Sequence, residues 1–167
     1  SKTRGFASWS LGKKIGAILG GTLVTVAAIG AVIVASKLSK INTVKLDTDK
    51  LSVSKEAKKR GSGYLNVALF GVDSRDNDLD KGTRSDTIMI ASLNKKTMKV
   101  KIASIYRDTL SEQEDGTLNK INAAYSYGGP EGALSVLNKN LDMNIEHYVT
   151  VNFNSMIDIV DSVGGID

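Results

Sequence analysis

The sequence predicts an α/β domain with a mixed central sheet flanked by helices, preceded by one transmembrane helix. Three observations support this expectation. A long apolar run without a charge lies near the N-terminus, three apolar runs of strand length occupy the middle, and apolar residues at helical spacing follow in the last part of the chain. Strands interleaved with helices are typical of the α/β class.

The first apolar run covers residues 15–35 and holds no charged side chain. With a rise of about 1.5 Å per residue, a helix of this length crosses the hydrocarbon core of a bilayer. The run is longer than the apolar core of a usual signal peptide, so we expect an uncleaved signal anchor. Basic residues before the run favour a cytoplasmic N-terminus over residues 1–14, with the rest of the chain outside the cell.

Residues 36–62 are rich in Lys, Ser, Thr and Asp and have no sustained apolar stripe, which predicts an extracytoplasmic tether. The structured domain is expected over residues 63–167. Charge is divided unevenly: residues 1–62 hold 12 Lys/Arg and 3 Asp/Glu, a net +9, whereas residues 63–167 hold 10 and 15, a net −5. Because nucleic-acid binding needs a basic surface, nucleic acid is not expected as a partner. The absence of Cys excludes disulfides and thiolate metal sites.

The three strand-length runs begin the domain. Residues 65–72 are nearly all apolar, as in a strand covered on both faces, and residues 87–93 are similar. Residues 99–105 start with an alternating pattern that predicts one solvated face. The short link at residues 94–97 predicts that the second and third runs form an antiparallel hairpin.

The last part of the domain is expected to contain two helices and a strand. Pro130 suits the first position of a helix. Residues 146–153 resemble a strand, Asn154 can cap a final helix, and Gly164 can end it. Apolar side chains recur on one face of the first helix at Leu134, Leu137 and Leu141.

Arg and Asp side chains stand together at the ends of the three strand runs. Open α/β sheets bind ligands beyond their strand ends, so these side chains are expected to form one polar site. Ordinary exposed ion pairs are the alternative. The repetition favours an anion held by arginine forks, with a divalent cation held by carboxylates, as in a phosphate or pyrophosphate site. The residues are Asp73, Arg75, Arg84, Asp86, Arg107 and Asp108.

Several motifs resemble the LytR-CpsA-Psr family in content, order and spacing. The resemblance covers about residues 63–167, and the preceding membrane anchor also fits the family. Tyr106 stands where the family often has Pro. The motifs are NVALFGVDSR at 66–75, GTRSDT at 82–87, SIYRDT at 104–109, KINAAY at 120–125 and GGP at 128–130.

The resemblance implies a membrane-anchored phosphotransferase of the LytR-CpsA-Psr type. Such enzymes transfer glycopolymers, such as wall teichoic acid or capsular polysaccharide, from a polyprenyl pyrophosphate carrier to peptidoglycan. It further implies Mg²⁺ held by Asp73 and Asp86, phosphate oxygens bound by Arg84 and Arg107, and Asp73 as a candidate proton acceptor. Arg75 and Asp108 are expected to bind substrate or to orient their neighbours.

Family members continue beyond the position of Asp167 into a segment with an Arg-x-Arg pair. The chain is therefore expected to be a C-terminally truncated member of the family, and the resemblance does not predict whether it is active by itself. Two other functions stay open. One is a membrane-tethered transcriptional regulator or attenuator. The other is a polyprenyl pyrophosphate hydrolase, which would use the same residues with water in place of the sugar acceptor.

Overall fold

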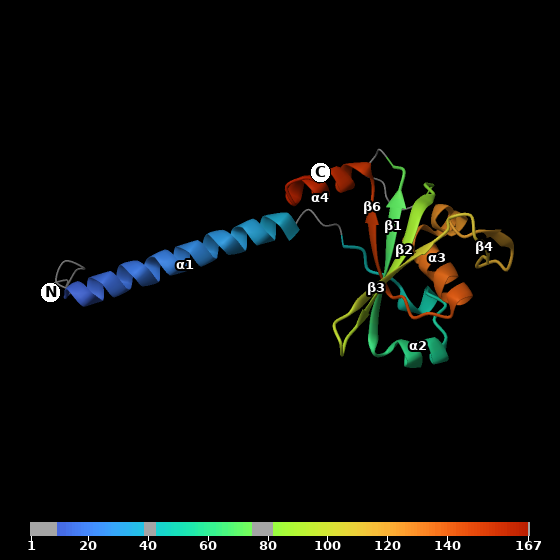
Figure 1. Ribbon diagram of the computed structural model, residues 1–167, viewed down its shortest axis with the longest axis horizontal. Helices are drawn as coiled ribbons and strands as arrows, with labels where there is room; N and C mark the ends of the chain where they lie inside the picture. The colour runs from blue at the N-terminus through green and yellow to red at the C-terminus, as the bar shows by residue number, and fades with distance from the viewer. Residues whose placement is uncertain (1–9, 39–42, 75–81, 167) are drawn as a thin grey trace. The chain divides into compact units, whose positions relative to one another are not determined.

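The computed structural model describes residues 10–38, 43–74 and 82–166 (Figure 1). The chain divides into two compact units, Ser1–Lys45 and Leu46–Asp167. In the first unit, α1 (Leu11–Leu38) is a single helix whose described side chains are exposed. Its segment Leu11–Val32 is long and apolar enough to cross a membrane, with a mean hydropathy of 2.1. The segment overlaps the predicted span at residues 15–35.

The second unit is built on a four-stranded mixed sheet with the order β3-β2-β1-β6 (Figure 1). Its strands are β1 (Tyr64–Val72), β2 (Ser85–Asn94), β3 (Val100–Ile105) and β6 (His147–Val151). β1 pairs antiparallel with β2 and parallel with β6, and β2 pairs antiparallel with β3. The α/β class, the mixed sheet and the hairpin between the second and third runs are therefore confirmed.

One face of the sheet forms the core of the unit. Along β1, fully buried residues alternate with half-buried ones. The buried set packs against α3 (Ala123–Leu141), and the Phe70 ring meets the Tyr125 ring edge-on at a centroid distance of 5.2 Å. We expected β1 to be buried on both faces, but among the described residues only one of its faces is fully buried. The edge strand β3 is almost wholly exposed.

α3 is interrupted where the sequence places a helix start. Gly129 adopts φ 64° and ψ −156°, which is outside the helical region, and the helix resumes at Pro130. A proline fits there because the backbone amides of the first helical turn have no acceptor within the helix, so the missing N–H of proline costs no hydrogen bond. Leu134 and Leu137 are buried as expected, whereas Leu141 is 40% exposed.

The final helix, α4 (Phe153–Ser162), starts earlier than predicted. Its N-cap is Asn152 rather than Asn154, and the Asn152 side chain accepts a hydrogen bond of 2.8 Å from the Ser155 amide. The shift arises because Asn152, which directly follows β6, is the last residue in an extended conformation. Gly164, with φ 90°, follows the helix end as predicted.

Residues 46–62 belong to the folded unit, so the boundary predicted at residue 63 is wrong. This segment forms a 3₁₀ turn, η2 (Thr48–Lys50), and a short helix, α2 (Lys55–Gly61). Leu51 is 0% exposed within the core, and its carbonyl accepts a 2.9 Å hydrogen bond from the Asn138 side chain. Only two residues of the segment, Leu51 and Ala57, are buried apolar residues. Two residues do not make a periodic apolar pattern, so the sequence did not indicate that the segment is folded.

A small hairpin that the sequence did not predict completes the unit. Its strands are β4 (Leu110–Glu112) and β5 (Leu118–Lys120). At the turn, Asp115 accepts hydrogen bonds from the amide and the hydroxyl of Thr117, at 2.9 and 2.7 Å. Gly116 has φ 81°, a conformation that favours glycine.

Candidate functional site

A β-bulge places Asp86 at the end of the sheet. Gly71 pairs with Thr87 but the next residue, Val72, pairs with Ser85, which leaves Asp86 as an extra residue on β2. Bulges change the direction of a side chain, and here Ser85 is buried while Asp86 is exposed. At Gly71, opposite the bulge, the two strands lie close together: an added Cβ would be 3.0 Å from the Cβ of Thr87, so a side chain there would force Thr87 to shift.

The pairing of β2 with β3 brings Arg107 to Asp86. Ile105 ends β3 opposite Ile88, so two residues further on Arg107 lies level with Asp86. The Arg107 Nη1 donates to Asp86 Oδ1 at 2.5 Å. Two of the predicted site residues, which are distant in the sequence, are therefore in direct contact.

The ion pair extends to Asp108 and Lys120. Arg107 Nε lies 3.8 Å from Asp108 Oδ2, and Lys120 Nζ lies 2.5 Å from Asp108 Oδ1. The hydrogen bond from Lys120 lowers the pKa of Asp108, and the positive charges of Lys120 and Arg107 act in the same direction. Lys120 was not among the predicted residues, although it opens the KINAAY motif. The resulting charge cluster consists of Asp86, Arg107, Asp108 and Lys120.

The loop after β3 is held by backbone hydrogen bonds. The amide and hydroxyl of Thr109 both donate to the carbonyl of Tyr106, at 3.0 and 2.7 Å. This turn closes with Tyr in the place where the family often has Pro. The Asn122 amide donates to the Arg107 carbonyl at 3.3 Å, which fixes the loop against the start of α3.

Asp73 and Arg84 lie at the same sheet end as the charge cluster, beyond the last pair of β1 and β2. Val72 of β1 pairs with Ser85 of β2. Asp73 follows Val72 and Arg84 precedes Ser85, so both residues leave the paired strands at the same end of the sheet. Both side chains are exposed, and neither forms a hydrogen bond or ion pair with another described residue. They are thus open to a ligand. Arg75 lies outside the described residues.

Three buried polar atoms next to these side chains have no hydrogen-bond partner in the described part of the chain. They are Thr83 Oγ1, Ser85 Oγ and Asn122 Oδ1. Ser85 is 0% exposed and Asn122 is 5% exposed. Since buried polar groups are nearly always paired, these three atoms, like Asn66 Oδ1 and Asn144 Oδ1 elsewhere in the unit, retain unused hydrogen-bonding capacity. The only sequence signal for them was their position inside the GTRSDT and KINAAY motifs.

Asp73 and Asp86 are the acidic residues that could bind a cation together with a phosphate ligand. Within the described ranges, no group of three or more His, Cys, Asp or Glu side chains could hold a metal by itself. Asp73 and Asp86 nevertheless stand at adjacent strand ends. Mg²⁺ is commonly bound by one or two carboxylates together with substrate phosphates. The two carboxylates therefore fit a Mg²⁺ that a phosphate ligand helps to hold.

The fold is that of an α/β protein with a charge cluster at one end of its mixed sheet. The sequence model of the LytR_cpsA_psr family matches residues 29–167, and the chain belongs to this family. The predicted resemblance is confirmed.

Among curated relatives, the chain is similar to the polyisoprenyl-teichoic acid–peptidoglycan teichoic acid transferase TagU of Bacillus cereus (strain AH820). The two are 39% identical over 125 residues, which are 74% of this chain and 40% of the relative. This chain thus spans about 40% of the length of that relative.

Solved structures share the fold. TagV of B. subtilis has a TM-score of 0.55 and 34% identity, over 62% of this chain and 41% of that one. The family protein YwtF (TagT), whose structure contains octaprenyl pyrophosphate lipid, has a TM-score of 0.56, with 75% of this chain and 44% of that chain covered. At 23% identity, the likeness to YwtF is one of fold.

Proposed function

We propose that this chain provides the membrane anchor and part of the active site of a glycopolymer transferase. The substrate would be a glycopolymer, such as wall teichoic acid or capsular polysaccharide, linked to a polyprenyl pyrophosphate. The acceptor would be peptidoglycan. The observation that supports this most is the contact of Asp86 with Arg107 at the bulged sheet end, where Asp73 and Arg84 are also exposed.

Arg84 and Arg107 would bind the pyrophosphate oxygens. Guanidinium groups form paired, charge-assisted hydrogen bonds with phosphate, and they stabilise the negative charge that develops on the leaving phosphate. Arg107 is held by Asp86 and Asp108, so its orientation is set before a ligand arrives. Positioning and electrostatic stabilisation account for most of the catalysis of phosphoryl transfer.

In the proposed reaction, a sugar hydroxyl of peptidoglycan attacks the phosphorus that bears the glycopolymer. A new P–O bond forms to the acceptor oxygen, and the P–O bond to the carrier breaks. The carrier leaves as polyprenyl monophosphate, which keeps the bonding electron pair. The exposed carboxylate of Asp73 would accept the hydroxyl proton.

Asp73 and Asp86 would also hold Mg²⁺, which would supply positive charge to neutralise the pyrophosphate. Further support comes from the relatives: TagU is named a teichoic acid transferase, and YwtF binds a polyprenyl pyrophosphate. The apolar helix α1 suits an anchor in the membrane that holds such a carrier. We place residues 1–14 in the cytoplasm and the catalytic unit outside.

The test is a transfer assay with the protein in liposomes that contain a polyprenyl pyrophosphate-linked glycopolymer and peptidoglycan fragments. Arg107→Ala and Asp86→Ala are each expected to lower transfer by at least about 100-fold, because each removes a charge that acts on the phosphates. Chelation of Mg²⁺ should have a similar effect, reversed by added Mg²⁺. Lys101→Ala, an exposed change on β3, is the matched control.

Transfer that survives both site substitutions would refute the assignment. Release of polyprenyl phosphate without attachment of the polymer to peptidoglycan would instead identify a hydrolase, since the same residues would then act on water.

A further inference from the structure

A groove whose lining contains no residue of the charge cluster lies along α3. One wall is the β4–β5 hairpin, and the other is the segment around Lys50 and Ser52. It contains two adjoining cavities of about 630 and 300 Å³. Both cavities are lined by Glu114, Tyr127, Gly128 and Gly132.

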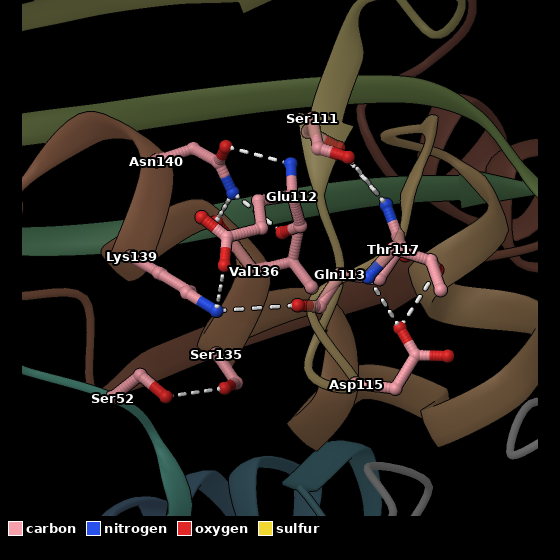
Figure 2. Close-up of polar contacts among 10 residues, drawn as sticks. All are labelled: Ser52, Ser111, Glu112, Gln113, Asp115, Thr117, Ser135, Val136, Lys139 and Asn140. Atoms are coloured by element: carbon pink, nitrogen blue, oxygen red, sulfur yellow. Dashed lines mark hydrogen bonds and ion pairs between the residues drawn. The ribbon is translucent and has the colours of Figure 1, made fainter.

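Both walls of the groove are fastened to α3 (Figure 2). On the hairpin side, the Asn140 side chain donates to the Glu112 carbonyl at 2.9 Å and accepts from the Glu112 amide at 3.0 Å. On the other side, the hydroxyls of Ser52 and Ser135 are 2.7 Å apart. A groove held in this way needs little ordering when a ligand binds, which favours affinity.

The charged side chains of the groove do not favour a polyanion. Its lining contains two lysines and three carboxylates, Glu114, Asp115 and Glu131, and both lysines are paired within the protein. Lys50 lies 3.2 Å from Asp47 and 3.9 Å from Glu131, and Lys139 lies 2.9 Å from Glu112. Since neither lysine is left without a carboxylate, the groove offers little attraction to a polyanion. Its hydroxyls, carboxylates and ammonium groups suit an uncharged ligand that is rich in hydroxyl groups.

Tyr127 adds an aromatic surface to these polar groups. Its side chain is 68% exposed and lines both cavities, beside two glycines that leave the surface of α3 bare. An aromatic ring offers a flat apolar surface to the C–H groups of a pyranose ring, while the sugar hydroxyls hydrogen-bond to the surrounding polar side chains. We propose that this groove binds an uncharged sugar chain.

The groove is connected to the phosphate site through the first part of α3. The Ser126 carbonyl accepts a hydrogen bond of 3.2 Å from the amide of Gly82, two residues before Arg84. The Asn122 amide donates to the Arg107 carbonyl. The segment that lines the groove therefore also contacts both loops that present arginines. Given the proposed function, on which this step rests, the bound sugar is the glycan strand of the acceptor.

The test measures sugar binding by calorimetry on the full chain, in a detergent without a sugar headgroup. The probe is chitotetraose, an uncharged chain of N-acetylglucosamine. Saturable binding is expected, with about a tenfold loss of affinity in Tyr127→Ala, because the ring contact is removed, and near wild-type affinity in Tyr127→Phe.

A second variant fills the groove without straining the fold. An added Cβ at Gly128 meets nothing within 4 Å, so Gly128→Leu should place its side chain in the groove and abolish binding. Gly63→Leu is the matched control, because Gly63 is equally open but lies outside the groove. Equal thermal melting of the four variants would show that they are folded.

Three results would overturn the inference: absence of chitotetraose binding, unchanged affinity in both Tyr127→Ala and Gly128→Leu, or displacement of the sugar by poly(glycerol phosphate). Arg107→Ala separates this inference from the proposed function. It should abolish transfer while leaving chitotetraose affinity unchanged, so a wrong phosphate site and a wrong sugar groove give different results.

Discussion

At the scale of single residues, Asp108 shows how the charge cluster sets the ionisation of a carboxyl group. The hydrogen bond from Lys120, followed by the charges of Lys120 and Arg107, lowers the pKa of Asp108 below its ordinary value of 3.8. Because the pKa is lowered in the folded state, this pairing stabilises the fold above pH 3.8 and is lost as the pH falls through the folded-state pKa. We expect Lys120→Met to raise the pKa of Asp108 towards 3.8.

An NMR titration of the Asp108 carboxyl carbon measures this directly. Lys95→Met is a suitable control, because Lys95 lies on the turn between β2 and β3, where its Nζ donates to the Ser62 carbonyl. An Asp108 pKa that does not change in Lys120→Met would show that the observed pair is not maintained in solution.

The structure brings three of the predicted site residues, Asp86, Arg107 and Asp108, into one cluster, but its detailed arrangement could not be predicted. Arg and Asp at strand ends could be found from apolar runs alone, and the contact of Asp86 with Arg107 follows once the hairpin is in place. The bulge at Asp86 could not be predicted, because it depends on the register of two strands. The pairing of Asp108 with Lys120 was also missed, since it joins a loop to a strand that was not foreseen.

At the scale of elements, the segment before β1 is a structural part of the domain. Leu51 is 0% exposed and lies in the same cluster as Phe70, Leu134 and Leu137. Leu51→Ala should lower the free energy of unfolding by about 2–5 kcal/mol, through lost burial and the cavity that remains. Leu118→Ala is the control, because Leu118 is 68% exposed and the same change should cost less than about 0.5 kcal/mol.

Denaturant unfolding of the two variants measures both free energies of unfolding. If Leu51→Ala proved as stable as Leu118→Ala, the segment over residues 46–62 would be a tether after all, and the domain boundary predicted at residue 63 would be restored.

Elements with strong periodicity were predicted well, and elements held by a few contacts were not. The strands β1, β2 and β3 and the helix after Pro130 follow from apolar patterns that extend over many residues. In contrast, the segment over residues 46–62 and the β4–β5 hairpin are held by single contacts with α3, such as the hydrogen bonds of Asn138 to Leu51 and of Asn140 to Glu112. Such contacts between distant residues leave no local pattern for the sequence to reveal.

At the scale of the whole molecule, charge and apolar surface are divided between a basic N-terminal unit with an apolar helix and an acidic folded unit. Residues 1–45 hold 7 Lys/Arg and no Asp/Glu, a net +7, whereas the folded unit over residues 46–167 holds 15 Lys/Arg and 18 Asp/Glu, a net −3. α1 could cross a bilayer by its length and composition. A domain with a net negative charge is poorly suited to bind nucleic acid, which disfavours the regulator.

The orientation of the chain separates the regulator from the transferase, and the absence of cysteine makes it easy to test. Thr97→Cys introduces one thiol at an exposed position in the turn between β2 and β3, and Ser10→Cys introduces one just before α1. With the N-terminus inside and the folded unit outside, a membrane-impermeant maleimide should label Thr97→Cys in intact cells. It should label Ser10→Cys only after the membrane has been permeabilised. The opposite pattern would place the folded unit in the cytoplasm, where no peptidoglycan is available, and would favour the regulator over the transferase.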